Sequence, residues 1–374
     1  MVFDKQAIID RRYMALALKL AANGLSTTDP NPCVGCVIVK NNTVLGEGWH
    51  ITAGEAHAEV IALADAGSEA KGATAYVTLE PCCHKGRTGA CTEALYAAGI
   101  SRVVYAVDDP NPLVAGQGAE WLRAQGIDVT GGLLADQAVA INAGFWSRMQ
   151  RQRPLVVSKL AVSIDGRTAL SNGDSHWVSG ESSREDVQRW RAQSSAVLTG
   201  VGTILADDPS LNVRSASYQH AKQPLRVILD SNLSTPPAAR TLSLPGDVLI
   251  ITVSDDASKR DALESAGASV VKVASDKGRV SLPDVLDLLA EKEINIVMLE
   301  AGSVLNGSFL QQGLINELLV YQASHLMGSD AIGMFTMFPL GDMSKRVELT
   351  LQDVCRIGKD LRLRYIFKEI ESED

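Results

Sequence analysis

GEAHAEV spans residues 54–60, TLEPC spans residues 78–82, and a further cysteine stands at position 91. The histidine and the last glutamate of the first motif lie at the start of a predicted helix. The second motif follows the end of a predicted strand, and Cys91 begins the next predicted helix. Strands and helices therefore alternate around these motifs, which is typical of a layered α/β domain.

One histidine and two cysteines match the ligand number of a catalytic zinc site, in which the fourth position stays open for water. We therefore expect His57, Cys82 and Cys91 to bind one Zn²⁺ per chain. Zinc lowers the pKa of its water to about 7, and Glu59 would carry the proton to the ring nitrogen and the leaving amine. His-x-Glu followed by Pro-Cys-x-x-Cys is the pattern of the nucleobase deaminases.

The cysteine spacing departs from that pattern, because eight residues separate Cys82 from Cys91. Cys83 competes with Cys82 as a ligand, but neighbouring loop residues rarely both point at one metal, so we expect Cys83 to pack. Cys33 and Cys36 are also expected to pack, since residues three apart on a strand face opposite sides. Taken singly, each of these side chains could be an ordinary structural residue.

Length and charge set further limits. The 374 residues suit two domains of about 100–200 residues each, and the polar, basic stretch at residues 148–154 predicts domains at 1–150 and 151–374. The net charge of −9 argues against a nucleic-acid partner. No apolar run is long enough for a membrane span. Without an export signal, we expect a cytoplasmic protein with reduced cysteines.

Hydrophobic periodicity predicts the elements of both domains. Helices are expected at 5–23, 56–66, 92–98, 118–125, 181–193, 259–266 and 282–292. Strands are expected at 33–39, 44–50, 73–79, 101–107, 127–130, 155–160, 196–199, 225–230, 247–253, 269–273, 295–299 and 317–322. The glycine-rich segments after residues 199 and 299 suit turns that approach a pyrophosphate, but taken singly each fits an ordinary turn between a strand and a helix better.

Several motifs together resemble one family. TDPNPCVG at residues 28–35 and DPNP at residues 109–112 join the zinc motifs in the first half, and KLAVSIDGR at residues 159–167 and EAG at residues 300–302 mark the second. The chain thereby resembles the bifunctional riboflavin-biosynthesis deaminase–reductases, in which the longer cysteine spacing is usual. The resemblance implies an N-terminal cytidine-deaminase-like three-layer domain and a C-terminal dihydrofolate-reductase-like domain.

The resemblance also implies two reactions. The first is hydrolytic deamination of 2,5-diamino-6-(5-phosphoribosylamino)pyrimidin-4(3H)-one. The second is reduction by NADPH of the ribosyl group of 5-amino-6-(5-phosphoribosylamino)uracil to ribityl. The expected partners are these phosphoribosylaminopyrimidines, and the expected assembly is a homo-oligomer.

In the deaminase half, the resemblance assigns substrate contacts to six residues: Asn31, His50, His84, Arg87, Asp109 and Asn111. A guanidinium at Arg87 suits a phosphate dianion. Asn-Pro and Asp-Pro pairs also mark turns, so a purely structural role for Asn31, Asp109 and Asn111 stays open.

In the reductase half, the resemblance assigns cofactor contacts to Ala161, Trp177, Thr203, Asp207, Ser231 and a turn at Gly302, Ser303, Val304, Leu305, Asn306 and Gly307. It assigns substrate contacts to Lys159, Asp165, Ser175, Arg191, Leu211, Arg214 and Glu300. Arg191 and Arg214 suit the substrate phosphate. From the residues alone, both arginines would be solvated surface charges and Trp177 a core residue.

Two other functions are compatible with the zinc motifs. One is a nucleobase or tRNA-adenosine deaminase with an unrelated second domain, against which the cysteine spacing and the acidic charge argue. The other is a binding module stabilised by zinc. A closed structural site would hold a fourth protein ligand and would not need Glu59 as an acid.

Overall fold

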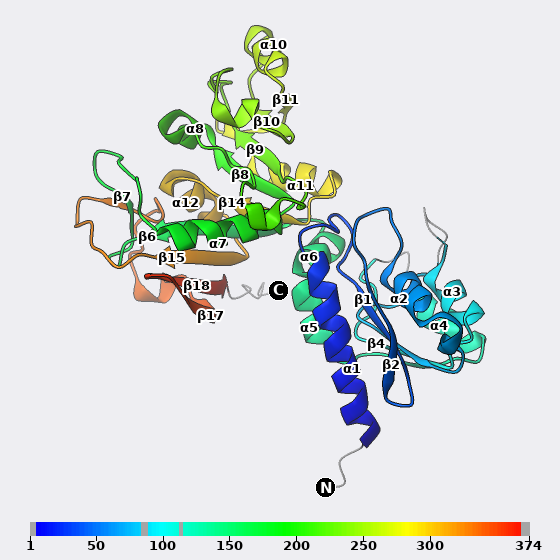
Figure 1. The fold of residues 1–374 in the computed structure, drawn as a ribbon. Helices are drawn as coiled ribbons and strands as arrows, with labels where there is room; N and C mark the ends of the chain where they lie inside the picture. Colours follow the sequence, from blue (N-terminus) through cyan, green and yellow to red (C-terminus); the bar gives the residue numbers. More distant parts are fainter. Residues whose placement is uncertain (1–4, 84–88, 112–114, 368–374) are drawn as a thin grey trace. The chain divides into compact units, whose positions relative to one another are not determined.

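The computed structural model describes residues 5–83, 89–111 and 115–367. The chain divides into two compact units, residues 1–152 and 153–374 (Figure 1).

The first unit contains a five-stranded sheet in the order β2-β1-β3-β4-β5. Its strands are β1 (Gly35–Lys40), β2 (Thr43–Trp49), β3 (Thr74–Val77), β4 (Arg102–Tyr105) and β5 (Asp128–Thr130). β3, β4 and β5 run parallel, whereas β1 is antiparallel to both β2 and β3. The first two expected strands, at residues 33–39 and 44–50, therefore pair as a hairpin.

Helices cover both faces of this sheet (Figure 1). They are α1 (Lys5–Ala21), α2 (Ala58–Ala66), α3 (Cys91–Ala97), α4 (Gln117–Ala124), α5 (Ala135–Ile141) and α6 (Ala143–Arg151). Ala62 of α2 and Leu122 of α4 are buried on one face. Met14 of α1 and Ala138 of α5 are buried on the other. The expected three-layer arrangement is confirmed.

Glycines in β2 let α2 lie unusually close to the sheet. A Cβ atom on Gly48 would stand 2.4 Å from the carbonyl oxygen of Ala58, and one on Gly46 would stand 2.2 Å from that of Ala62. Both distances are far below a van der Waals contact, so any larger residue would push the helix away. Gly48 sets the distance between the sheet and the start of α2, and Gly46 sets it between the sheet and the end of α2.

The second unit is built on a nine-stranded sheet in the order β11-β10-β9-β8-β14-β6-β15-β18-β17. Its strands are β6 (Leu155–Val162), β8 (Ala196–Gly200), β9 (Leu225–Leu229), β10 (Val248–Thr252), β11 (Ser269–Lys272), β14 (Ile296–Leu299), β15 (Glu317–Gln322), β17 (Leu349–Ile357) and β18 (Asp360–Phe367). The strands from β11 to β15 in this order are parallel, and the β17–β18 hairpin adds an antiparallel edge. Short ladders join β12 (Ser275–Asp276) to β13 (Arg279–Val280) and β7 (Arg167–Ala169) to β16 (Ile332–Gly333).

Helices also cover both faces of the second sheet. They are α7 (Glu181–Ala192), α8 (Val201–Asp207), α9 (Arg240–Ser243), α10 (Ala257–Ser265), α11 (Leu282–Glu291) and α12 (Ser303–Gln311). Val187 of α7 and Ile204 of α8 enter one core, and Leu286 of α11 and Phe309 of α12 enter the other. Among the described residues, no helix is both long and apolar enough to cross a membrane.

A buried carboxylate fixes the start of α7. Asp360, the first residue of β18, accepts hydrogen bonds from the Gly180 amide at 2.7 Å and from the Ser183 hydroxyl at 2.6 Å. Gly180 is the residue before the helix, so the carboxylate meets the end where amide groups lack helical partners. The last strand pair therefore holds the helix that begins 180 residues earlier.

The structure contains elements that the periodicity did not predict. These are α5, α6, α8, α9, α12, the small ladders and the β17–β18 hairpin. The hairpin residues of β17 are mostly exposed, so they lack the alternation of apolar and polar residues that marks a strand with one buried face.

Gly48→Ala is expected to lower the free energy of unfolding of the first unit by about 1–3 kcal/mol, because the added methyl group overpacks the contact with α2. Urea unfolding of the full chain measures the change. Glu47→Ala, at an exposed position of the same strand, is the matched control and should have little effect. Equal stability of the two variants would contradict the close-packing argument.

Candidate active sites

The pairing register of the first sheet places one end of each of four strands at the same edge. Gly35 pairs with Trp49, and Val77 pairs with Tyr105. Since Cys36 pairs with Val77, the start of β1 and the ends of β2, β3 and β4 lie together. The segments that leave the sheet at this edge carry the residues expected to act in deamination.

The three predicted zinc ligands converge at that edge. His57 immediately precedes α2, Cys82 follows β3, and Cys91 is the first residue of α3. His57 Nδ1 lies 3.1 Å from Cys91 Sγ and 3.6 Å from Cys82 Sγ. All three ligand atoms lie within 4.8 Å of one another. A tetrahedral zinc ion fits this donor set of one imidazole and two thiols.

The two thiols share one proton. The hydrogen bond from Cys91, assisted by His57, lowers the pKa of Cys82 to about 4. The same hydrogen bond and burial raise the pKa of Cys91. The pair therefore holds one thiolate and one thiol, and a metal ion that needs both thiolates must displace the proton.

Glu59 lies beside the cluster in the first turn of α2 and is 3% exposed. Burial, followed by the negative charge of Cys82, raises the pKa of Glu59 to about 7. Its carboxylate also hydrogen-bonds with Cys91. A carboxyl group with a pKa near neutrality can both take up and release a proton, as an acid–base catalyst must.

His50 and Asn31 form a connected pair at the same edge. His50 Nδ1 lies 3.2 Å from the Ala56 carbonyl oxygen, so this nitrogen donates. Nε2 then accepts from the Asn31 amide nitrogen at 3.1 Å. Burial lowers the pKa of His50, which keeps the ring neutral. His50 is 3% exposed, so its geometry suits holding the Asn31 amide in place.

Glu80 is a residue whose role the sequence analysis missed, although it lies inside the TLEPC motif. Its buried carboxylate accepts backbone hydrogen bonds from Asp109 at 3.3 Å, Gly116 at 2.9 Å and Ala119 at 3.0 Å. The Asp109 carboxylate in turn accepts from the Asn111 amide at 2.9 Å. Glu80 thus anchors the segment that holds two of the expected substrate contacts.

The remaining cysteines stand apart from the cluster. Cys33 and Cys36 are buried, as the sequence predicts. Cys83 is half-buried rather than packed in the core, and its sulfur lies 3.9 Å from Gln117 Oε1. His84 and Arg87 lie outside the residues that the structure describes.

The second sheet also gathers its expected site at one edge. β9, β8, β14 and β6 are parallel neighbours, so their carboxyl ends meet. Ser231 follows β9, Thr203 lies in the helix after β8, Gly302 follows β14, and Ala161 lies near the end of β6. Such an edge is where open α/β sheets bind ligands.

Two predicted turns at this edge are wrong. Residues 201–207 form α8, and residues 303–311 form α12, so Ser303, Val304, Leu305, Asn306 and Gly307 lie in the first turns of a helix. The reason is packing, because the fully buried Phe309 anchors α12 in the core below the sheet. Thr203 and Asp207 likewise lie in α8.

A buried carboxylate between two cations lies at the end of β14. Glu300 Oε1 accepts from Arg191 Nε at 2.6 Å, and Oε2 lies 3.3 Å from Lys159 Nζ. Burial alone would raise the pKa of Glu300, but the charges of Arg191 and Lys159 outweigh it and hold the pKa at about 2. The Glu300 carboxyl group is therefore ionised at neutral pH.

Arg191 is therefore a buried, paired residue and not a solvated surface charge. Its exposure is 7%, and Nη2 gives Glu300 a second hydrogen bond at 3.0 Å. Nη1 donates to the Asn212 carbonyl oxygen at 3.1 Å. Leu211, the neighbouring predicted contact, is also buried.

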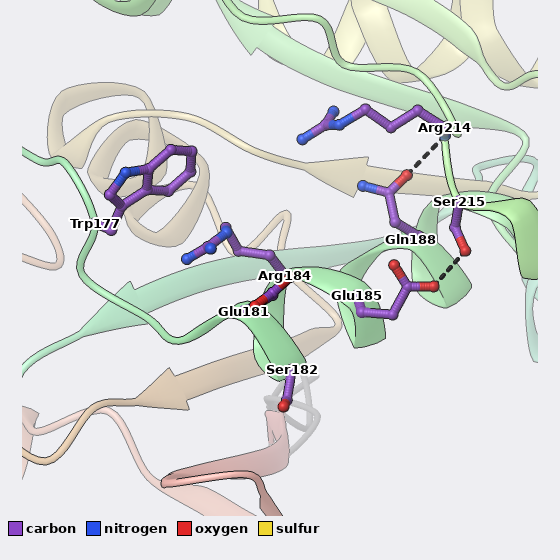
Figure 2. Close-up of a pocket in the computed structure, with 8 residues that line it drawn as sticks. All are labelled: Trp177, Glu181, Ser182, Arg184, Glu185, Gln188, Arg214 and Ser215. Carbon is purple, nitrogen blue, oxygen red and sulfur yellow. Dashed lines mark hydrogen bonds between the residues drawn. The ribbon is translucent and has the colours of Figure 1, made fainter.

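A pocket of about 740 Å³ opens beside α7. Trp177 lines it and is 68% exposed, so the core position expected from the residue type is wrong. The Arg184 guanidinium stacks on the Trp177 ring at 4.1 Å from its centroid. Figure 2 shows Arg184 and Arg214 extending toward Trp177, with Gln188 holding the Arg214 backbone. Neither Arg184 nor Gln188 lies in a motif that the sequence analysis identified.

The carboxylate of Asp165 accepts hydrogen bonds from other groups of the same unit. Its carboxylate accepts from the Ser163 hydroxyl at 2.5 Å and from the backbone amides of Met327 and Gly328. These bonds tie the turn after β6 to a loop far along the chain. Ser175 lies in the segment that leads to Trp177 and is half-buried.

Cys82→Ser is expected to lower the zinc content of the purified chain, because it removes one of the three converging ligands. Cys83→Ser is the matched control and should leave the zinc content unchanged, since Cys83 lies outside the cluster. Elemental analysis measures both. Equal loss of zinc from the two variants would show that the ligand assignment is wrong.

Glu300→Gln is expected to make the stability of the second unit less sensitive to acid. The folded pKa of about 2 lies below the ordinary 4.5, so the carboxylate stabilises the fold above about pH 4.5 and loses this effect as the pH falls toward 2. The shift corresponds to about 3 kcal/mol.

Urea unfolding at neutral pH and near pH 3 measures this difference. The unsubstituted chain should lose more free energy of unfolding between the two conditions than Glu300→Gln does. Glu291→Gln, at an exposed position, should behave like the unsubstituted chain. The same acid dependence in all three proteins would contradict the ionised cluster.

Comparison with known proteins covers both units. The model of the cytidine and deoxycytidylate deaminase zinc-binding region matches residues 8–107, and the model of the RibD C-terminal domain matches residues 154–363. The riboflavin biosynthesis protein RibD of Escherichia coli K12 is 44% identical, covering 96% of this chain and 99% of its own length. The RibD of Bacillus amyloliquefaciens is 41% identical and covers 98% of both chains.

Solved structures agree over the same range. RibD of Acinetobacter baumannii (form 2) has a TM-score of 0.90 at 43% identity and covers 97% of this chain and all of its own. A deaminase/reductase of Thermotoga maritima has a TM-score of 0.85 at 30% identity, with the same coverage. The match to one polypeptide across both units, with a zinc-binding deaminase region in the first, means that the chain belongs to the RibD family, the bifunctional deaminase–reductases of riboflavin biosynthesis.

Proposed function

We propose that residues 1–150 deaminate 2,5-diamino-6-(5-phosphoribosylamino)pyrimidin-4(3H)-one and that residues 151–374 reduce the product, 5-amino-6-(5-phosphoribosylamino)uracil. The observation that carries the proposal is the cluster of His57, Cys82 and Cys91 beside a buried glutamate, in a chain with a second α/β unit. The Thermotoga maritima relative is described as a diaminohydroxyphosphoribosylaminopyrimidine deaminase/5-amino-6-(5-phosphoribosylamino)uracil reductase, which names both substrates.

In the deaminase unit, His57, Cys82 and Cys91 would hold zinc. Zinc, when bound, supplies a Lewis acid that makes water nucleophilic at neutral pH. Glu59 removes a proton from the attacking water and returns it to the amine that leaves as ammonia. The carbon–nitrogen bond to the amine breaks, and the water oxygen becomes the carbonyl oxygen of the uracil. The pKa of Glu59 near 7 suits both transfers.

Asn31, His50, Asp109 and Asn111 would hold the substrate in this unit. Asn31 keeps its amide oxygen for the pyrimidine, since its nitrogen is engaged by His50. His84 and Arg87 are proposed to contact the ribose phosphate.

In the reductase unit, the carboxyl edge of the sheet would bind NADPH. A Cβ at Gly302 would meet no atom within 4 Å, so the start of α12 is open to a pyrophosphate. The proposed cofactor contacts are Ala161, Trp177, Thr203, Asp207, Ser231 and residues 302–307. Cleavage of the ring carbon–oxygen bond, with a proton going to the oxygen, opens the sugar and leaves a carbon–nitrogen double bond at C1. NADPH, when bound, supplies the hydride that reduces C1 and so gives the ribityl chain.

Of the proposed substrate contacts of the reductase unit, Arg214 lines the pocket beside α7. Lys159, Glu300 and Ser175 supply polar groups for the sugar, and Leu211 supplies an apolar wall. Arg191 holds Glu300 through two hydrogen bonds, which suits a positioning role. Asp165 holds the loop at residues 327–328 instead of offering a free carboxylate.

The alternatives lose support for physical reasons. A zinc-stabilised binding module would have no use for a buried glutamate with a pKa near 7 beside an incomplete ligand set. A tRNA-adenosine deaminase with an unrelated second domain would not match RibD proteins across both units. The homo-oligomer stays a prediction.

Glu59→Gln is expected to slow deamination by about 10²–10⁴-fold, because the amide keeps the shape but cannot accept a proton. Zinc content should stay the same, as Glu59 is not a proposed ligand. NADPH oxidation with the uracil substrate should also stay the same, since distant sites act independently. Two spectrophotometric assays and elemental analysis measure these effects.

Glu69→Gln, an exposed position in the same unit, is the matched control for deamination. Near-normal deamination by Glu59→Gln would refute its role as the proton carrier. Loss of NADPH oxidation with the uracil substrate would instead refute the independence of the two units.

A further inference from the structure

The pocket beside α7 contains two arginines whose charges are not neutralised by a carboxylate. For the Arg214 guanidinium, the described part of the chain offers no hydrogen-bond partner. Arg184 donates one hydrogen bond, from Nη1 to the Ser179 carbonyl oxygen at 2.8 Å, and stacks on Trp177. Both guanidinium groups therefore keep free N–H donors that can face a ligand.

The acidic residues of the pocket do not cancel these charges. Glu185 accepts a hydrogen bond from the Ser215 hydroxyl, and this bond joins α7 to the segment that carries Arg214 (Figure 2). Glu181 lies at the exposed start of α7. No ion pair of Arg184 or Arg214 with either glutamate is formed among the described residues.

Arg191 contrasts with these two arginines. Its Nε and Nη2 bind Glu300, and its Nη1 binds Asn212. With these three N–H groups engaged, Arg191 has few hydrogen-bond donors left for an anion. A phosphate at this pocket must obtain its positive partners elsewhere.

We infer, resting on the proposed reductase function, that Arg184 is a further specificity-determining residue, which binds the phosphate of the ribosylaminouracil substrate together with Arg214. A planar guanidinium matches two phosphate oxygens at once. The stack on Trp177 holds the guanidinium plane of Arg184 in place before the substrate arrives.

The local electrostatics support this assignment. Burial, followed by the charge of Arg191, lowers the pKa of Arg214. The charge of Glu300 opposes this shift, and the charge of Arg184 adds to it. The cations therefore repel one another in the empty pocket. A phosphate dianion between Arg184 and Arg214 would relieve this repulsion, which favours phosphorylated ligands over neutral ones.

Arg184→Ala in the full-length protein tests the inference through NADPH oxidation with two substrates, the phosphorylated ribosylaminouracil and its dephosphorylated form. The KM for the phosphorylated substrate should rise about tenfold or more, because a charge-assisted contact is lost. The kcat should change little. The preference for the phosphorylated over the dephosphorylated substrate should fall by the same factor as the KM rises.

Two further variants serve as controls. Arg184→Lys keeps the charge without the planar fork and should recover part of the preference. Arg189→Ala removes an arginine of the same helix that pairs with Asp186 and does not line the pocket, so it should keep the original preference. An unchanged preference in Arg184→Ala, or an equal loss for both substrates, would overturn the inference.

Failure of the proposed function would be visible separately, as absence of NADPH oxidation by the unsubstituted protein with either substrate. In that case, calorimetric titration with ribose 5-phosphate still decides the role of Arg184. Binding that is about tenfold weaker in Arg184→Ala than in Arg189→Ala would support an anion site. Equal binding in the two variants would overturn it.

Discussion

Strands that run in the same direction end at the same edge of a sheet, and both units depend on this constraint. In the first unit, it brings the segments after β2, β3 and β4 together around the metal cluster. In the second unit, it aligns the ends of β6, β8, β9 and β14. Residues far apart in the chain therefore meet because hydrogen bonding between the strand backbones places the ends of their strands side by side. Their side chains need no specific contacts with one another to be brought together.

Each unit stabilises a buried carboxylate near this edge, but by different means. Glu80 accepts three backbone amide hydrogen bonds from the segment at residues 109–119, so its charge is solvated by dipoles. Glu300 lies between two side-chain cations. A buried charge is tolerated in either case because its acceptors are satisfied. Glu80 thereby fixes a backbone segment, whereas Glu300 fixes side chains.

The sequence reveals the metal site better than the reductase pocket for a physical reason. His57 and Cys91 are close in sequence and lie at the starts of helices that local patterns predict. Arg191 meets its partner Glu300 across 109 residues, so periodicity could not show that its charge is buried and paired. Trp177 is 68% exposed although the Arg184 guanidinium stacks on its ring, and such a contact between two side chains leaves no periodic pattern. Helix α12 was mistaken for a turn because Gly302 and Gly307 are typical of turns, and the anchoring of Phe309 in the core is not visible in the sequence.

The hydrogen bonds that Asp360 accepts at the start of α7 affect the order in which the two units are completed during synthesis. The metal cluster needs residues up to position 91, whereas the start of α7 gains its buried carboxylate from position 360. Domains fold as units while the chain emerges from the ribosome, the N-terminal one first. The deaminase ligands can therefore assemble on a growing chain, but the helix carrying Arg184 and Arg191 acquires its anchor near the end of translation. A ribosome that stalls within the last β-hairpin would release a chain with its metal ligands complete and its reductase helix unanchored.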